Sequence, residues 1–201
     1  MPPDRKRYSV AQRLTVASGI SSQRARFQSP GRSRCLDEQP HFTDNDIIDD
    51  MNNQPKLVID TNILVAATRN RHGPSFALMQ ILRLGQVKMC CSPALFLEYE
   101  DVLKRADQLA ASGLLASDID AILNGLARLI EPVTTHYQWR PQLRDPADEM
   151  VLEAAANAQA QAIVTYNLRD FGPAKLFGIP VLNPEQTFQQ FHLTVQRSSK
   201  P

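Results

Sequence analysis

An unbroken apolar run that ends in a carboxylate constrains the fold of this chain more than any other feature. Residues 56–59 are Lys-Leu-Val-Ile, and Asp60, Thr61 and Asn62 follow directly. Such a run is typical of a strand buried on both faces, as in a parallel sheet. Asp60 then falls at the carboxyl end of the strand, where open α/β sheets gather ligands and catalytic groups. A carboxylate there needs a cation beside it. No Lys or Arg stands within the next several residues, so we expect a metal ion.

Apolar runs and helical periodicities alternate from residue 55 onward, which predicts βαβ units around a parallel sheet. A Ser117–Asp120 capping box is expected to open one helix, whose apolar stripe extends to Ile130. The expected strands are 56–60, 87–91, 162–165 and 179–182, and the expected helices are 74–85, 93 to about 105, 117–130, 145 to about 159, and 184–191. The predicted fold class is α/β, a three-layer α/β/α domain with a central parallel sheet over residues 55–192.

The first 50 residues lack sustained hydrophobic periodicity. Residues 1–35 carry eight Lys or Arg against Asp4 alone, whereas residues 36–50 carry six acids and no Lys or Arg. That composition favours disorder. We therefore expect residues 1–54 to be a disordered extension or a non-native segment upstream of a true start at Met51, with a transit peptide as the other alternative. Residues 193–201 are expected to form a flexible tail.

Composition excludes several classes of protein. A net charge of +1 gives no global nucleic-acid signature. No segment approaches the about 20 apolar residues that a membrane span needs, and no signal-peptide core is present. The three cysteines have neither disulfide-framework nor metal-site spacing, so Cys90 and Cys91 are expected to pack within a strand. These features predict a reducing, cytoplasmic location.

Acids or amides stand at four predicted strand ends or helix starts: Asp60, Glu98, Asp148 and the Asn167–Asp170 turn. Since the strands before Asp60 and Asn167 should be parallel neighbours, both turns face the same edge of the sheet. Two carboxylates about 4 Å apart repel by about 4 kcal/mol at an effective dielectric near 20. A cluster of them must therefore take up protons or bind divalent cations, and all-oxygen ligation selects Mg²⁺ or Mn²⁺. A metal pair held in this way can activate water against a phosphodiester.

Each acid also has a purely structural interpretation. Asp148 suits the positive end of a helix dipole, and Asp145 suits an N-cap position. Glu98 shares a helix face with Asp101, so it could be exposed to solvent. Glu153, within an alanine-rich helix, is expected to pair with solvent.

Four motifs resemble the PIN domain family, most closely the bacterial and archaeal members described as toxin components of toxin–antitoxin systems. They are residues 58–62 (VIDTN), 92–99 (SPALFLEY), 144–149 (RDPADE) and 163–171 (IVTYNLRDF). The resemblance spans roughly residues 56–190. It implies a Mg²⁺- or Mn²⁺-dependent endoribonuclease that hydrolyses RNA phosphodiesters, a small antitoxin protein as partner, and the capacity to form a homodimer.

The resemblance also implies roles for individual residues. Asp60, Glu98 and Asp148 match the three acidic metal ligands and are the expected catalytic residues. Many relatives have a fourth acid where this chain has Asn167, so Asp170 is an expected further ligand and a second metal is expected to be weakly held. The expected supporting residues are Asn62, Thr165, Asn167, Glu149 and Asp145.

An RNA substrate also needs cations near the acids. Arg69 and Arg71 lie in the loop expected after the first strand and are the predicted substrate contacts, with ordinary surface charge as the alternative.

Two other enzyme classes fit poorly. A phosphohydrolase of the haloacid-dehalogenase type would carry a second Asp where Asn62 stands, and a dinucleotide-binding enzyme needs a glycine-rich turn that this chain lacks. The alternative that stays open is a catalytically weakened PIN-fold module that binds RNA or an antitoxin partner.

Overall fold

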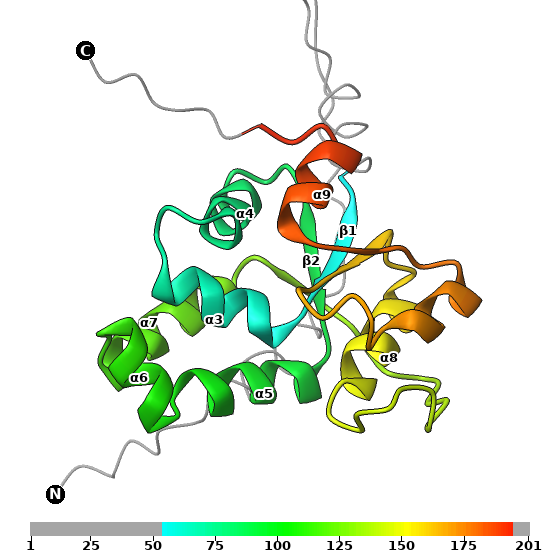
Figure 1. The fold of residues 1–201 in the computed structure, drawn as a ribbon, viewed down its shortest axis with the longest axis horizontal. Coiled ribbons are helices and arrows are strands. Elements are labelled where there is room, and N and C mark those ends of the chain that lie inside the picture. Colours follow the sequence, from blue (N-terminus) through cyan, green and yellow to red (C-terminus); the bar gives the residue numbers. More distant parts are fainter. Residues whose placement is uncertain (1–53, 195–201) are drawn as a thin grey trace, which may run out of the picture.

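Five parallel strands form one sheet in the computed structural model, which describes residues 54–194. Their spatial order is β3–β2–β1–β4–β5, and Figure 1 shows β1 beside β2. The strands are β1 (Lys56–Ile59), β2 (Lys88–Cys91), β3 (Ile130–Pro132), β4 (Ala162–Val164) and β5 (Val181–Leu182). The first strand in sequence is thus the central one, and it pairs with β2 on one side and β4 on the other.

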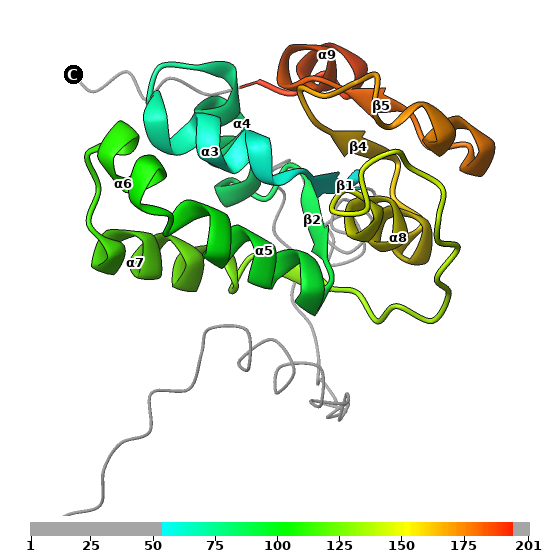
Figure 2. The same ribbon diagram turned by 60° about the horizontal axis from the view of Figure 1, so that its bottom comes forward.

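Helices cover both faces of this sheet, because parallel strands need long crossover connections. The helices are α3 (Thr61–Arg69), α4 (Pro74–Arg83), α5 (Pro93–Leu103), α6 (Ala106–Ser112), α7 (Ala116–Leu126), α8 (Glu149–Ala158), the 3-10 helix η1 (Gly172–Phe177) and α9 (Pro184–Gln190). Helices α4 and α9 pack together on one face, whereas α5 and α8 pack together on the other (Figure 2). The result is the three-layer α/β/α fold that the sequence predicts.

The core explains why β1 takes the central place. Leu57, Val58 and Ile59 have no exposed surface, as expected of a strand covered on both faces. Ala154 and Ala155 of α8 are also fully buried, and their small side chains let this helix lie close to the sheet. Burial of each large core side chain contributes about 1.5–3 kcal/mol. The acid that follows β1 is therefore attached to a strand that is packed on both faces.

Several elements differ from the prediction. The segment after β1 is the helix α3, so Arg69 is its last residue and does not lie in a loop. The apolar residues of β1 and of this helix follow each other in sequence with no Gly or Pro between them, which hides the boundary. Ile130 begins the edge strand β3, although it continues the apolar spacing of the preceding helix.

Two predicted helix starts are also wrong. α7 begins at Ala116, and the Asp118 carboxylate accepts the N–H of the N-cap residue Leu115 at 2.9 Å. The expected Ser117–Asp120 box lies inside that helix. α8 begins at Glu149, since Asp145 instead holds a turn by accepting the Ala147 N–H at 2.9 Å.

The predictions for residues 1–53 and 195–201 lie outside the described residues. Within residues 54–194, no single helix is long and apolar enough to cross a membrane; the bent pair α6 and α7 passes that test by length and composition only.

Candidate functional site

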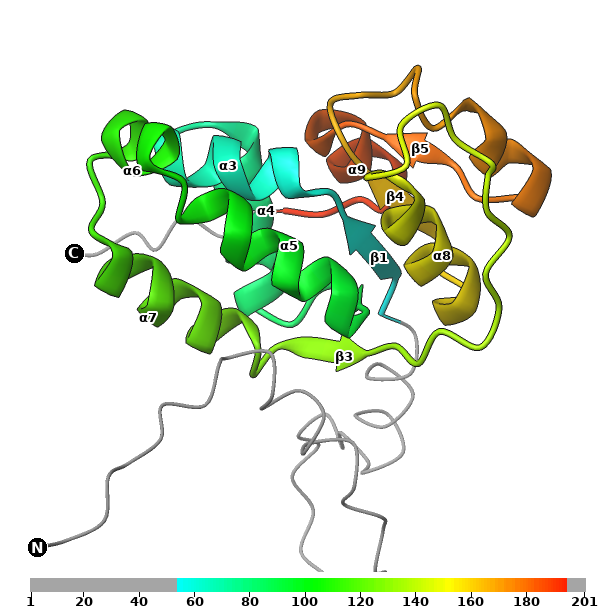
Figure 3. The same cartoon turned by 90° about the horizontal axis from the view of Figure 1, so that it is seen from below.

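Asp60 lies at the carboxyl end of β1, where the backbone turns into α3 (Figure 3). This residue is only 5% exposed. Oδ2 accepts hydrogen bonds from Asn62 Nδ2 and Thr165 Oγ1, both at 2.6 Å. Burial raises the pKa of this carboxyl group, and the Thr165 hydrogen bond offsets part of that rise.

Asn62 and Thr165 join the ends of two neighbouring strands around this carboxylate. Asn62 Nδ2 also donates to Thr165 Oγ1 at 2.9 Å, and Asn62 Oδ1 accepts the N–H of Tyr166 at 3.3 Å. Thr165 Oγ1 in turn accepts the N–H of Asn167 at 2.9 Å. Since β1 and β4 are parallel neighbours, the small polar residues after each strand meet at one edge and fix the Asp60 carboxylate in place.

Helix α5 brings Glu98 to the same edge. The helix begins after Ser92, whose hydroxyl accepts the Leu95 N–H at 3.3 Å. Tyr99 is fully buried and donates its hydroxyl to the carbonyl oxygen of Ile59. Because Ile59 directly precedes Asp60, this bond anchors the helix beside the end of β1 and places the preceding residue, Glu98, next to the site.

Glu98 carries a buried oxygen that lacks a partner. Among residues 54–194, neither Glu98 Oε2 nor the buried Thr61 Oγ1 makes a hydrogen bond. Burial raises the pKa of Glu98; the nearby Thr61 hydroxyl offsets part of the rise without reaching hydrogen-bond geometry, and the charge of Asp60 adds to it. An unsatisfied carboxylate oxygen is costly inside a protein, so this atom is placed for a ligand that supplies positive charge.

Asp148 shows most directly that the acids converge. It is the half-buried N-cap residue of α8. Burial raises the pKa of Asp148 to about 6, and the charges of Asp60, Asp145, Asp170 and Glu98 contribute to that rise in this order. Carboxylates from β1, α5, the loop before α8 and the turn after β4 therefore act on one group.

The loop at residues 133–148 is held by one polar strip on α8. Glu149 is 2% exposed, and its Oε1 accepts the backbone N–H groups of Gln142 and Leu143. Four residues on, Glu153 is bound by both Nε and Nη2 of Arg140 at 2.7 and 2.8 Å. The prediction that Glu153 pairs with solvent is wrong, because its side chain is buried against this guanidinium. Through these two hydrogen bonds Glu149 holds the loop that leads to Asp148.

The turn after β4 is open to solvent. Asn167 and Asp170 are both exposed, and the Asp170 N–H donates to the Asn167 carbonyl oxygen at 3.1 Å. Asn167 brings no charge to the site, whereas Asp170 contributes to the raised pKa of Asp148. Asp170 therefore lies within electrostatic reach of the other acids, at the solvent side.

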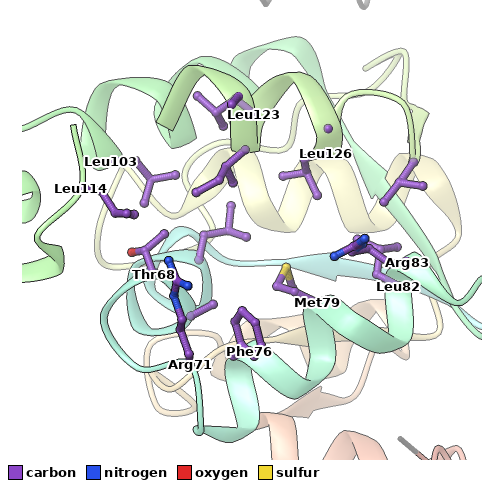
Figure 4. Close-up of a pocket in the computed structure, with 16 residues that line it drawn as sticks. Thr68, Arg71, Phe76, Met79, Leu82, Arg83, Leu103, Leu114, Leu123 and Leu126 are labelled. Carbon is purple, nitrogen blue, oxygen red and sulfur yellow. The ribbon is translucent and has the colours of Figure 1, made fainter. Parts of the chain in front are cut away.

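The two predicted substrate arginines lie at the far end of α3. Arg69 closes the helix and donates Nη2 to Gln108 Oε1 of α6 at 2.5 Å. Arg71 lies in the wall of an apolar cavity of about 450 Å³ formed by α3, α4 and α7 (Figure 4). Arg69, at the end of α3, is nine positions from Asp60, which corresponds to about 13 Å along the helix. The cavity wall contains Arg83 but no carboxylate, so this space is distinct from the acidic edge.

The donor set fits a hard divalent cation. Asp60, Glu98 and Asp148 supply only oxygen atoms, and one of these oxygens is buried without a partner. In the described part of the chain, no three Asp, Glu, His or Cys side chains are close enough together to ligate one ion as they stand. A bound cation would offset the mutual repulsion of these carboxylates.

The fold and this edge define an α/β protein with a carboxylate-rich site at the carboxyl ends of its central strands. A PIN domain profile matches residues 56–169, more than half of the chain, and the chain belongs to this family. PIN domains are typically nucleases and generally use divalent metals. The matched range includes Asp60, Glu98 and Asp148 but ends before Asp170. No curated protein matches this chain.

Sequence reasoning missed three contributors to the site: Thr61, Tyr99 and the Arg140–Glu153 pair. Tyr99 and Thr61 carry no signal of their own, because their contacts join elements far apart in sequence. A signal did exist for the third. Glu149, Glu153 and Asn157 recur every four residues on an otherwise apolar helix, and that spacing places them on one face.

Proposed function

We propose that this chain is a metal-dependent endoribonuclease that hydrolyses RNA phosphodiesters. The observation that carries the proposal is the gathering of Asp60, Glu98 and Asp148 at one sheet edge, where Glu98 Oε2 is buried without a hydrogen bond among the described residues. The raised pKa of Asp148, caused by burial and by four neighbouring acids, supports it. Structural stability gives no reason to gather such charges. A site that binds a cation beside a phosphate does need carboxylates close together.

In this proposal Asp60, Glu98 and Asp148 hold Mg²⁺ or Mn²⁺, and Asp170 adds charge from the solvent side. When bound, the ion supplies an activated water and neutralises charge that develops on the phosphate. The chain's own residues orient the ligands: Asn62 and Thr165 fix one Asp60 oxygen, and Glu149 fixes the loop that leads to Asp148. Tyr99 holds α5 against β1 through the carbonyl of Ile59.

Cleavage of a short, end-labelled RNA in Mn²⁺ tests the proposal. We expect Asp60→Asn to lose at least about 100-fold in rate, because the variant keeps the size of the side chain but removes its charge. Asp101→Asn is the matched control, since Asp101 is an exposed acid on the same helix as Glu98. Cleavage that survives Asp60→Asn would reject the assignment of this site.

A second candidate function rests on Asn167. An uncharged amide stands where the resemblance to PIN domains implies a fourth acid, and this residue is exposed. A chain with this weakness could bind RNA or an antitoxin partner without efficient cleavage. RNA binding by the wild-type chain with no metal-dependent products would favour this candidate over the nuclease.

We propose further that the chain acts as the toxin of a toxin–antitoxin pair. The apolar cavity between α3, α4 and α7 supports a small protein partner, because it could receive apolar side chains. Arg71 and Arg83 in its wall favour acidic residues beside those side chains. Co-purification with the product of a small neighbouring reading frame, lost in Arg71→Glu, tests this pairing.

A further inference from the structure

Three aromatic rings form a row on the surface beside α8. Tyr137 and Trp139 are stacked, with ring centroids 5.5 Å apart and planes inclined by 24°. Trp139 also contacts Phe177 of η1, with centroids 5.3 Å apart. Tyr137 is 65% exposed and Trp139 is 40% exposed. These two rings come from the loop at residues 133–148, which lies beside η1 in Figure 3.

The backbone under the row is firmly held although the rings are exposed. Asn157 accepts the Tyr137 N–H at 3.1 Å and donates to the Tyr137 carbonyl oxygen at 3.0 Å. Gln142 Nε2 donates to the Trp139 carbonyl oxygen at 2.6 Å. Next to Trp139, Arg140 is bound to Glu153 through two hydrogen bonds. The loop therefore presents aromatic faces to solvent from a fixed backbone, which is how a preorganised binding surface is built.

The charges around the row are complementary to a polyanion. Residues 133–144 of the loop contain no acid, and the charge of Arg140 is already paired with that of Glu153, so the free cation of the loop is Arg144. Arg144 is exposed, and so is Lys175, which stands two residues before Phe177 on η1. An apolar surface edged by cations suits nucleobases and phosphates better than it suits the apolar face of a neutral helix.

The row also lies at a useful distance from the acids. Asn157, which holds Tyr137, is in the last turn of α8, and Asp148 precedes the first. The helix has 10 residues and is therefore about 15 Å long. A nucleotide stacked on the row would be a few nucleotides from a phosphodiester at the acidic edge.

We propose that Tyr137, Trp139 and Phe177 form a stacking platform for an unpaired base of single-stranded RNA. This inference rests on the proposed function and names its substrate class. The open face of Tyr137 takes the base, Trp139 and Phe177 support that ring from behind, and Arg144 and Lys175 bind neighbouring phosphates. Bases in a duplex are already stacked on each other, so the platform selects single strands.

The sole tryptophan of the 201-residue chain reports on this platform directly. Because Trp139 is that residue, intrinsic tryptophan fluorescence can be titrated with a short oligouridylate in EDTA, which blocks metal-dependent cleavage. We expect quenching that saturates as the single strand is added. The affinity derived from it should be at least fivefold lower for an RNA duplex of equal length.

Two variants of Tyr137 distinguish the effect of its aromatic ring from the effect of side-chain size. Tyr137→Leu should weaken oligouridylate binding about 5- to 100-fold, whereas Tyr137→Phe, which keeps the ring, should bind like the wild type. Far-ultraviolet circular dichroism checks that both variants fold. Lys175→Gln, at an exposed position, should reduce the slope of log affinity against log salt concentration by about 0.7. Equal affinity of Tyr137→Leu and the wild type, or equal binding of duplex, overturns the platform.

The failure of the platform and the failure of the nuclease give different results. Saturable quenching with no cleavage in Mn²⁺ supports the platform and rejects the proposed function. Cleavage without quenching supports the proposed function and rejects the platform.

Discussion

Asn62 Nδ2 lies 2.6 Å from Asp60 Oδ2, and the same amide group donates to Thr165 Oγ1 at 2.9 Å. One short side chain in the first turn of α3 therefore connects the acid after β1 to the hydroxyl after β4. These contacts occupy one oxygen of Asp60 and set the orientation of its carboxylate. Two residues without charge thus control the acid on which the proposed site depends.

Removal of the Thr165 hydroxyl should disturb this acid. Thr165→Val keeps the side-chain shape but deletes the hydrogen bond to the Asp60 carboxylate and the two that this hydroxyl accepts. We therefore expect a loss of about 2 kcal/mol in the free energy of unfolding. Thr187→Val is the control, because this buried hydroxyl donates only to the Asn183 carbonyl oxygen, at 2.8 Å. That variant should lose about 1 kcal/mol. RNA cleavage should fall about tenfold only in Thr165→Val.

Asp148 should make the metal-free chain more stable in mild acid. Its pKa rises from 3.8 to about 6 on folding, so its ionised form is disfavoured in the folded chain. The resulting destabilisation is present above pH 6 and disappears as the pH falls from 6 to 4. After allowance for solvent screening we expect about 1 kcal/mol.

Asp148→Asn provides the measurement. Urea unfolding in EDTA should show the variant about 1 kcal/mol more stable than the wild type at pH 7 and equal to it at pH 4. With Mn²⁺ at pH 7 the order should reverse, since a cation that binds the folded chain stabilises the wild type. A variant that is less stable than the wild type in EDTA at pH 7 would contradict the raised pKa.

The ion pair between Arg140 and Glu153 should matter more than its surface position suggests. The Glu153 side chain is only 6% exposed, whereas that of Arg140 is 47% exposed. Arg140→Ala leaves a buried carboxylate unpaired and should cost about 2 kcal/mol in unfolding free energy. Lys56→Ala breaks a pair whose side chains are 37% and 39% exposed, and should cost no more than about 0.5 kcal/mol. Equal losses in the two variants would show that burial of Glu153 is unimportant.

The sequence predicts the parts of this molecule that depend on local pattern. The strand before Asp60 is visible because four residues suffice to show burial on both faces, and the pairing of β1 with β4 follows from parallel topology. The acids at strand ends are visible because each follows a recognisable apolar run. The fold was therefore accessible from the sequence, while its helix starts at Ala116 and Glu149 were not. Two polar residues offered competing caps: Ser117 lies inside α7, and Asp145 lies before α8.

Long-range contacts stayed hidden for a physical reason. The Tyr99 hydroxyl bonds the Ile59 carbonyl across 40 positions of the chain, and only the packing of α5 on β1 brings them together. Arg140 is 13 residues from Glu153, and the path of the loop decides that they meet. The four-residue spacing of polar residues on α8 marks the strip that includes Glu153, but the partner of that residue depends on a tertiary distance that no sequence period encodes.

An acid at position 167 should strengthen metal binding at the turn after β4. The Asn167 N–H already donates to Thr165 Oγ1, so Asn167→Asp would change the side chain on a backbone that is held beside Asp60. The added charge should further raise the pKa of Asp148 without metal and attract a divalent ion more strongly with it. Titration calorimetry with Mn²⁺ should show one weak site in the wild type and at least a fivefold gain in affinity, or a second site, in Asn167→Asp.

Asp170→Asn is the complementary variant, since Asp170 also acts on Asp148; it should weaken binding. If Asn167→Asp binds no better and Asp170→Asn no worse, the turn after β4 takes no part in metal binding, and Asp60, Glu98 and Asp148 hold the ion without it.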